Sequence, residues 1–352
     1  MILNQVKRLI IKERMRFFFY EIAIVFLLIF VLSSFEWILL PLELNPDLFG
    51  IIFYIIRAVI IFFAIPIVII VMEKIVTSES DLRQRTKISA FKSHFMLYKM
   101  SKSNYKYQLL YGVLLLFLVF IPLDFFLYLL TPEMLLYNSF SLGIALQNSY
   151  LFLDNFLIFF TVLVIIQVFI AFAEETVYRG FINKRGSEHF NRISAVLIST
   201  YSYGFLSLLY YLDPVSSNFN LWFPIVWFLA LFLIGLVLSL TVIRRKWIFP
   251  SIFANSINNI IMVGIFWYFL KGGKYLEILI FIYMPLLIGS IILFIWQYHR
   301  IKDSISIGLN MLKSYVKNDE KEEEKSNDKY FRILFDFCVG ILVFLIGLLI
   351  AL

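Results

Sequence analysis

The sequence predicts an all-α integral membrane protein, a polytopic helical bundle of about nine transmembrane helices. Of its 352 residues, 61% are hydrophobic and 16% are charged, and the mean hydropathy is +0.88. A water-soluble core could not bury so much apolar surface, so lipid must contact much of the chain. The apolar residues also form runs of about 20, the length at which a helix crosses the hydrocarbon layer.

Nine such runs follow one another along the chain, and each predicts one membrane-spanning helix. The first follows a basic leader, KRLIIKERMR, and is too long for the apolar part of a signal peptide, so we interpret it as a retained anchor. The nine runs cover approximately residues 17–41, 48–72, 108–131, 149–173, 193–213, 221–243, 247–270, 275–298 and 333–352.

Lysine and arginine are distributed in a way that supports this number of spans. With the N-terminus in the cytoplasm, 28 of the 31 Lys and Arg residues fall on that side, in residues 1–16, 73–107, 179–192, 244–246 and 299–332. Because basic loops resist translocation, the pattern predicts a multi-pass protein of a cell membrane with a cytoplasmic N-terminus. These basic residues form no folded basic domain, so we expect no nucleic-acid partner.

Four regions follow from this organisation. Residues 1–107 are expected to form a two-helix membrane region with a basic cytoplasmic loop, and residues 108–298 a membrane core. Residues 299–332 combine a helix whose apolar residues recur at helical spacing with a charged linker, NDEKEEEKSNDK. We interpret that helix as one that lies in the inner membrane interface. Residues 333–352 are expected to form the C-terminal transmembrane helix.

One apolar run ends in an unusual group of charges, AFAEETVYRGF at residues 171–181. A charged group inside a span costs about 2.5 to 3.5 kcal/mol on insertion scales, so it needs a partner or a function. On a helix, Glu175 and Arg179 share a face and can form an ion pair. Glu174 is rotated by about 100° from Glu175 and has no assured counter-charge, so it is the candidate general base.

A second polar group recurs every fourth residue in a later run. Ser251, Asn255 and Asn259 would lie on one helical face. Amides and hydroxyls in such positions commonly link membrane helices by hydrogen bonds. The stripe is therefore open to a structural interpretation as well as to a catalytic one.

Together these segments resemble a known family, the CAAX-processing and bacteriocin-processing (CPBP) intramembrane endopeptidases, which include the type II CAAX prenyl proteases. EETVYRGF matches the family pattern EExxxR followed by glycine and an aromatic residue, and STYSYGFLS and WIFPSIFANSINN follow at suitable spacing. The resemblance covers roughly residues 165–265. It implies that the membrane core of residues 108–298 has the CPBP-like helical fold.

The resemblance also assigns roles by position. It implies that Glu174 activates water for peptide hydrolysis, that Glu175 and Arg179 complete the first motif, and that Asn259 is the final asparagine of the third. In the second motif, FxxxH, this chain has Tyr203 and Ser207. The histidine that opens the third motif, HxxxN, is replaced by Asn255.

These replacements change the chemistry that we expect. Asn255 can still donate an amide hydrogen bond, so with Asn259 it could stabilise an oxyanion. Ser207 cannot shuttle protons at neutral pH as histidine does, and on the predicted boundaries it lies deeper in the membrane than Glu174. The histidines of the chain fall in predicted cytoplasmic loops, so none replaces the missing imidazoles unless a loop folds back into the bundle: His94, His189 and His299.

Neither a metal nor another cofactor is expected. Carboxylates and amides without imidazole or thiolate are a poor ligand set for zinc. The single cysteine, Cys338, has no partner within the chain, so the sequence predicts no intrachain disulfide.

Two classes of function remain open. In the first, the protein is an endopeptidase that hydrolyses a membrane-associated peptide with a water activated by Glu174. In the second, it is a degenerate, non-catalytic scaffold or immunity-type protein that binds and positions a membrane or cell-envelope protein. A third, transport, would need a continuous polar path, which the scattered single charges support only weakly. The lipid bilayer is the partner common to all three.

Overall fold

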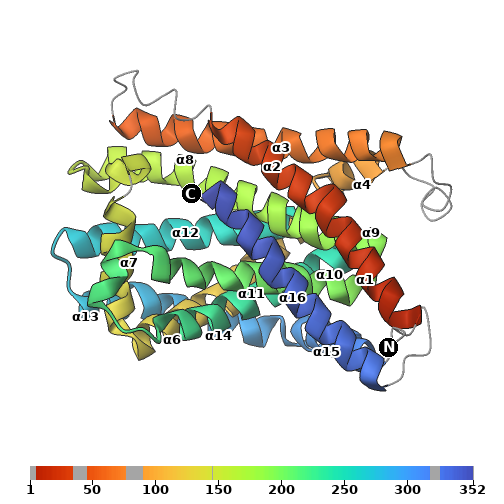
Figure 1. The fold of residues 1–352 in the computed structure, drawn as a ribbon. Coiled ribbons are helices and arrows are strands. Elements are labelled where there is room, and N and C mark those ends of the chain that lie inside the picture. The colour runs from red at the N-terminus through yellow and green to blue at the C-terminus, as the bar shows by residue number, and fades with distance from the viewer. Residues whose placement is uncertain (1–4, 35–45, 77–89, 145, 318–325, 352) are drawn as a thin grey trace.

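In the computed structural model the chain folds as a bundle of helices (Figure 1). The structure describes residues 5–34, 46–76, 90–144, 146–317 and 326–351. Within these ranges every regular element is helical and no strand occurs, which confirms the predicted all-α class.

Nine helices in the described ranges are long and apolar enough to cross a membrane, which confirms the predicted number. Four of them join two α-helical parts through a π-helical segment, and one ends in a 3₁₀ segment. In chain order the nine spans are built by α1 (Gln5–Phe17) with α2 (Ala23–Ser33); α3 (Pro46–Val76); α5 (Tyr105–Leu115) with α6 (Ile121–Leu130); α8 (Phe156–Glu175) with η5 (Thr176–Asn183) and α9 (Lys184–His189); α10 (Arg192–Gly204) with η6 (Phe205–Leu212); α11 (Phe223–Arg245); α12 (Phe249–Leu270); α13 (Tyr275–Ile278) with α14 (Met284–Trp296); and α16 (Ser326–Ala351).

The remaining elements either join the parts of a single span or connect one span to the next. The π-helical joints within spans are η1 (Phe18–Ile22), η3 (Leu116–Phe120) and η8 (Leu279–Tyr283). The connecting helices are α4 (Ala90–Met96), α7 (Pro132–Ile144), η4 (Leu146–Phe152), η7 (Pro214–Asn218) and α15 (Tyr298–Lys317).

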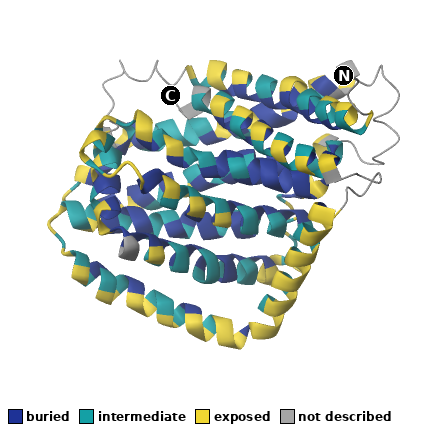
Figure 2. Cartoon of the chain, turned by 60° about the horizontal axis from the view of Figure 1, so that its bottom comes forward, coloured by how far each residue is buried: buried dark blue, intermediate teal, exposed yellow. Residues whose placement is uncertain are grey.

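The helices that carry the sequence motifs lie in the interior of the bundle. α8 packs between α3 and α12, and α10 packs against α11 and α16. Buried residues gather on these central helices, while exposed residues cover the outer ones (Figure 2). The motif side chains are thereby enclosed by protein rather than presented to lipid.

The helix that carries the charged motif differs from its prediction at both ends. It was expected at residues 149–173, but it begins at Phe156, because the Asn155 side chain accepts hydrogen bonds from the backbone N–H groups of Leu157 (2.9 Å) and Ile158 (3.3 Å) and so caps it. The residues before this cap are apolar and extended the predicted run. At its other end the helix continues through η5 and α9 to His189.

The first and last spans also begin earlier than predicted, at Gln5 and Ser326 instead of residues 17 and 333. Their polar ends are packed together. Arg14 Nε donates to Asp336 Oδ1 at 2.5 Å, and Arg14 Nη2 donates to Ser194 Oγ at 2.8 Å, with all three residues buried. This pairing makes the basic leader part of the bundle. Residues 318–325 of the predicted charged linker lie outside the described residues, and the rest of that linker begins α16.

The two ends of the bundle differ in charge. We call the end that holds α4, α9 and α15 the basic end; it lies on the right of Figure 1, opposite α13. In the described ranges the opposite end carries two lysines, Lys271 and Lys274, beside four carboxylates: Glu133, Asp154, Asp213 and Glu277. The asymmetry in Lys and Arg on which the positive-inside rule rests is therefore present in the folded bundle, with most of these residues at one end.

Candidate functional site

The first sequence motif lies at the junction between α8 and the π-helical segment η5. Glu175 and Arg179 are both fully buried, and Arg179 Nη1 lies 3.1 Å from Glu175 Oε1. The ion pair predicted from their spacing is thus formed. It leaves Glu175 Oε2 without a hydrogen-bond partner in the described part of the chain.

Tyr203 of α10 completes the surroundings of Arg179. The Arg179 guanidinium lies 4.1 Å from the centre of the Tyr203 ring, a close cation–π contact. Tyr203 also packs edge-on against Tyr178, with 5.1 Å between ring centres, and Ser199 Oγ donates to the Tyr178 backbone carbonyl at 2.8 Å. Tyr203, which stands where the resemblance expects phenylalanine, therefore holds the arginine between two helices.

Glu174 differs from its neighbour in exposure and in partners. Glu174 is half-buried, whereas Glu175 is fully buried. Asn255 Nδ2 donates to Glu174 Oε2 at 2.9 Å and to Glu175 Oε1 at 3.2 Å. Among the described residues, that amide is the only hydrogen-bond partner of Glu174. One carboxylate is thus paired with a cation, and the other is held by an amide alone.

Ser207 lies at roughly the same depth as Glu174, contrary to the expectation from the predicted boundaries. The motif helix and α10 form a tight hairpin whose corner is Phe190 and Asn191. Glu174 precedes this corner by sixteen residues, and Ser207 follows it by the same number. The predicted difference in depth arose because the motif helix was ended about fifteen residues too early.

The structure does not bring every predicted site residue into direct contact. Ser207 is fully buried, and its Oγ has no hydrogen-bond partner among the described residues. Asn259, one turn beyond Asn255 on α12, is half-buried and makes no hydrogen bond to either carboxylate within that part of the chain. The group in contact therefore consists of Glu174, Glu175, Arg179 and Asn255.

Two of the three histidines are not in exposed loops. His94 of α4 is 4% exposed, and its ring interacts with the backbone carbonyl of Gly180. Burial lowers the pKa of His94 to about 4, although the Gly180 carbonyl opposes that shift. His189 Nε2 lies 2.7 Å from Glu21 Oε1, in a largely buried pair. His299 is exposed, as expected.

The segment from α4 to Lys99 folds back against the motif helix, which the sequence analysis did not predict. Tyr98 donates from its hydroxyl to Thr176 Oγ1 at 2.9 Å, and the Ile248 backbone N–H donates to the Leu97 carbonyl at 3.2 Å. A Cβ at Gly180 would lie 3.1 Å from the Tyr98 hydroxyl, so the glycine of the motif leaves room for this tyrosine. The one available signal was the aromatic content of the segment FKSHFMLY.

His94 does not supply the missing imidazole. The ionisable groups that influence it are Glu188, Arg185 and Lys184 of α9, and neither motif carboxylate is among them. It stabilises the packing of α4 at the basic end. Within the described ranges, no three His, Cys, Asp or Glu side chains lie close enough to hold a metal ion.

Comparison with protein families supports the resemblance found in the sequence. Residues 155–261 match the family described as Rce1-like, the type II CAAX prenyl endopeptidases. This region is under a third of the chain and contains α8, α10 and the part of α12 that carries Asn255 and Asn259. No curated protein and no solved structure matches the chain. The protein thus contains an Rce1-like region within a multi-pass helical bundle, and this region points to a CAAX-protease type of intramembrane endopeptidase.

Proposed function

We propose that the protein is an intramembrane endopeptidase in which Glu174 activates the water that hydrolyses a peptide bond. The observation that carries this proposal is the hydrogen-bonded group of Glu174, Glu175 and Asn255 inside the Rce1-like region. Two adjacent carboxylates in unlike surroundings can take different roles. Glu175 is held by Arg179, and Glu174 is the carboxylate free to accept a proton.

In the proposed reaction, water attacks the scissile carbonyl carbon while Glu174 accepts a proton from that water. The tetrahedral intermediate carries a negatively charged oxygen, and we assign its stabilisation to the Asn255 amide, with Asn259 one turn away on α12. Glu174 then returns its proton to the peptide nitrogen, the C–N bond breaks, and a carboxylic acid and an amine leave. Since the Asn255 amide is bonded to both carboxylates in this structure, substrate must draw one of its N–H groups away.

Buried polar atoms on the helices of the Rce1-like region support a hydrated interior. Several hydroxyl and carboxylate oxygens have no hydrogen-bond partner in the described ranges: Glu175 Oε2, Thr200 Oγ1, Ser207 Oγ and Ser251 Oγ. Buried polar groups are costly when unbonded, and ordered water is their usual partner inside proteins. A water supply beside Glu174 is what the reaction needs.

Ser207 and Asn255 in place of histidines would make turnover slow. A general acid or base contributes about 10² to 10⁴ in rate, and neither serine nor asparagine can carry a proton at neutral pH. The role left to Ser207 in this proposal is to bond water at the depth of Glu174. Glu174 alone then performs both proton transfers.

We place the basic end in the cytoplasm and the protein in a cell membrane, following the distribution of Lys and Arg. The substrate is then a membrane-associated peptide that enters from the cytoplasmic leaflet. We keep the four regions defined above, with residues 108–298 as the catalytic core. The name of the matched family suggests a CAAX sequence with a prenyl group as the first substrate to test.

The test uses the full-length protein in proteoliposomes with two sets of peptides, one prenylated with a C-terminal CAAX sequence and one hydrophobic but unprenylated. Mass spectrometry of the products should reveal cleavage by the natural sequence and none by Glu174→Gln. Glu277→Gln, an exposed carboxylate at the opposite end, is the matched control and should cleave normally. Cleavage that survives Glu174→Gln would exclude this mechanism.

The second candidate function is a non-catalytic scaffold that binds a membrane or cell-envelope protein. The observation that favours it is the Asn255 amide, which occupies a histidine position and ties both carboxylates together. This candidate predicts a partner that co-purifies from native membranes equally with the natural sequence and with Glu174→Gln. Recovery of the protein without any partner would argue against it.

A further inference from the structure

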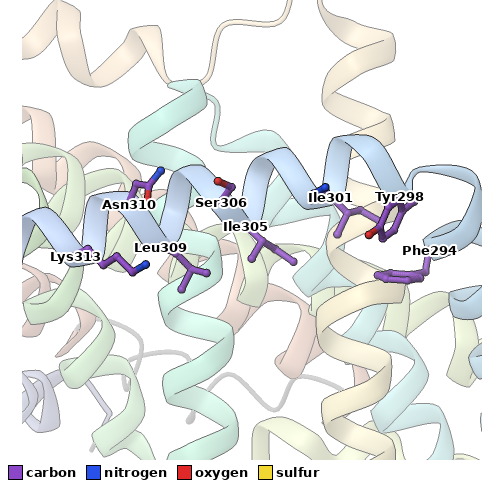
Figure 3. Close-up of a pocket in the computed structure, with 9 residues that line it drawn as sticks. Phe294, Tyr298, Ile301, Ile305, Ser306, Leu309, Asn310 and Lys313 are labelled. Carbon is purple, nitrogen blue, oxygen red and sulfur yellow. The ribbon is translucent and has the colours of Figure 1, made fainter.

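The helix α15 runs across the ends of the spans at the basic end instead of parallel to them (Figure 3). In Figure 2 it forms the largely exposed edge on the right of the bundle. Such a position is typical of a helix in the membrane interface. The question is what covers its outer face.

One face of α15 is fixed to the bundle. Met311, Leu312 and Tyr315 pack in a cluster with residues of α10 and α11, among them Ile193, Leu197 and Leu240. The Tyr315 hydroxyl donates to Asp336 Oδ2 at 2.7 Å, and Arg332 Nη2 donates to the Tyr315 carbonyl at 2.7 Å. These buried bonds to α16 set the rotation of the helix about its axis, and therefore which side chains point outward.

The outward face carries a second apolar stripe. Ile305, Leu309 and Val316 are each more than half exposed, and they fall within about 40° of one another at 100° per residue. The stripe continues onto Phe294, an exposed residue at the end of α14 that lines the same groove. α14 is a span whose outer side chains meet lipid. The stripe therefore continues this lipid-facing surface from α14 onto α15, where the chain changes direction.

Two lysines border this stripe. Lys302 and Lys313 are eleven residues apart, which places them on the same side of the helix within about 20°. Both are exposed, and neither has an ion-pair partner in the described part of the chain. In Figure 3, Ile305, Leu309 and Lys313 point to one side of α15, and Ser306 and Asn310 to the other.

A shallow groove of about 380 Å³ runs from Phe294 to Lys313, and its lining includes Ile305 and Leu309, both lysines, Ser306 and Asn310. Around the helix the order is apolar stripe, lysines, then Ser306 and Asn310. A lipid leaflet has the same order with depth, because its acyl chains give way to phosphates and then to polar headgroups. The lysines therefore complement the phosphate of an anionic lipid, and the apolar stripe complements its acyl chains.

We propose that this groove binds an anionic phospholipid of the leaflet at the basic end, with its phosphate between Lys302 and Lys313 and an acyl chain along Ile305 and Leu309. Ser306 and Asn310 would bond the headgroup. The site lies on α15, outside the Rce1-like region, and does not depend on the proposed hydrolysis. It would anchor α15, and through Tyr315 and Asp336 the C-terminal span, to the membrane surface.

The test measures lipid bound to the full-length protein in phosphatidylcholine nanodiscs that contain a small amount of phosphatidylglycerol, by native mass spectrometry. Each lysine near an anionic surface contributes about a fivefold gain in binding, so Lys302→Gln with Lys313→Gln should weaken phosphatidylglycerol retention by about 25-fold. Lys274→Gln, on the opposite end, is the control and should change nothing. Equal retention by the double variant would overturn the proposal.

A second measurement separates lipid from other occupants. A nitroxide attached at Leu309→Cys, in a Cys338→Ser background, should be accessible to oxygen dissolved in lipid and shielded from a water-soluble nickel complex. Access by the nickel complex, or displacement of phosphatidylglycerol by inorganic phosphate alone, would overturn the assignment. Thermal unfolding of each variant shows whether α15 remains packed.

Discussion

The Asn255 amide nitrogen lies 2.9 Å from Glu174 Oε2, so α12 is bonded to the motif helix at the carboxylate proposed to do the chemistry. The same nitrogen lies 3.2 Å from Glu175 Oε1. An amide at this position fixes the two carboxylates relative to each other, and it donates hydrogen bonds without being able to carry a proton. Asn255 thus keeps hydrogen bonds to both carboxylates at a position where the resemblance expects histidine.

Two substitutions of Asn255 should distinguish the loss of its hydrogen-bond donor from the addition of a negative charge beside the carboxylates. Asn255→Ala removes the donor and should reduce the hydrolysis rate by about 10² to 10³, the usual cost of losing one oxyanion donor. Asn255→Asp should be worse, because it adds a third carboxylate beside Glu174 and Glu175. Single-turnover hydrolysis in proteoliposomes measures both variants. An Asn255→Asp protein as active as the natural sequence would contradict the assigned role.

The buried pair of Glu175 and Arg179 should be essential for stability. Arg179→Met leaves a buried carboxylate without its cation, which typically costs about 3 to 5 kcal/mol. Denaturant unfolding in detergent measures the loss, and Arg300→Met, an exposed arginine of α15, is the control. Adding Glu175→Gln to Arg179→Met should recover much of the lost stability. If it recovers none, the instability of Arg179→Met has another origin.

The packing of α4 should weaken in acid because of His94. Its pKa falls from 6.5 to about 4 on burial, so between those values the unfolded chain binds a proton that the folded chain does not. Above pH 6.5 His94 is neutral in both states and the free energy of unfolding does not change. As the pH falls from 6.5 toward 4, that free energy decreases by about 1.4 kcal/mol per pH unit, or about 3 kcal/mol in total.

Amide hydrogen exchange of residues 90–104 measures this effect directly. Exchange should accelerate as the pH is lowered through that interval, after correction for the intrinsic rate. In His94→Gln the acceleration should disappear, because glutamine does not titrate. Persistence of the same acceleration in that variant would show that another group is responsible.

Much of the bundle and part of the site could be predicted from local sequence. The number of spans follows from runs of apolar residues, and the pair of Glu175 with Arg179 follows from helical spacing. The contact of Asn255 with Glu174 joins helices eighty residues apart. The resemblance assigned both residues to one site, but it did not predict their hydrogen bond, since spacing within one helix does not specify which helix lies opposite.

The wrong helix boundary at Phe156 and the unpredicted burial of His94 also arise because hydropathy does not record the contacts that individual side chains make. The apolar residues before Phe156 extended the predicted span, although the Asn155 cap begins the helix later. The segment around His94 and Tyr98 mixes aromatic residues with lysine and has no clear period, so its burial depends on the helices against which it packs. Hydropathy records how apolar a segment is, not which neighbour covers it.

Restoring a histidine at the position of Ser207 tests whether the missing proton carrier limits the rate. Ser207 faces the interior at the depth of Glu174, so Ser207→His should raise hydrolysis by about 10² if the imidazole fits. The pH–rate profile should then gain a step near the pKa of histidine. Thr200→His, at a buried position of α10 seven residues before Ser207, is the control. A folded Ser207→His protein with an unchanged rate would contradict the assigned position.

The central claim is that Glu174 is the base that activates water, and the hydrolysis rate of matched glutamine variants tests it most directly. Glu174→Gln and Glu175→Gln are nearly isosteric, and both keep a hydrogen-bonding side chain beside Asn255. With the natural protein, both variants and one cleaved peptide in the same proteoliposomes, we expect Glu174→Gln to lose about 10² to 10⁴ in the single-turnover rate. Glu175→Gln should act mainly on stability and leave much of that rate. Glu174→Gln that hydrolyses the peptide as fast as the natural protein would contradict the account.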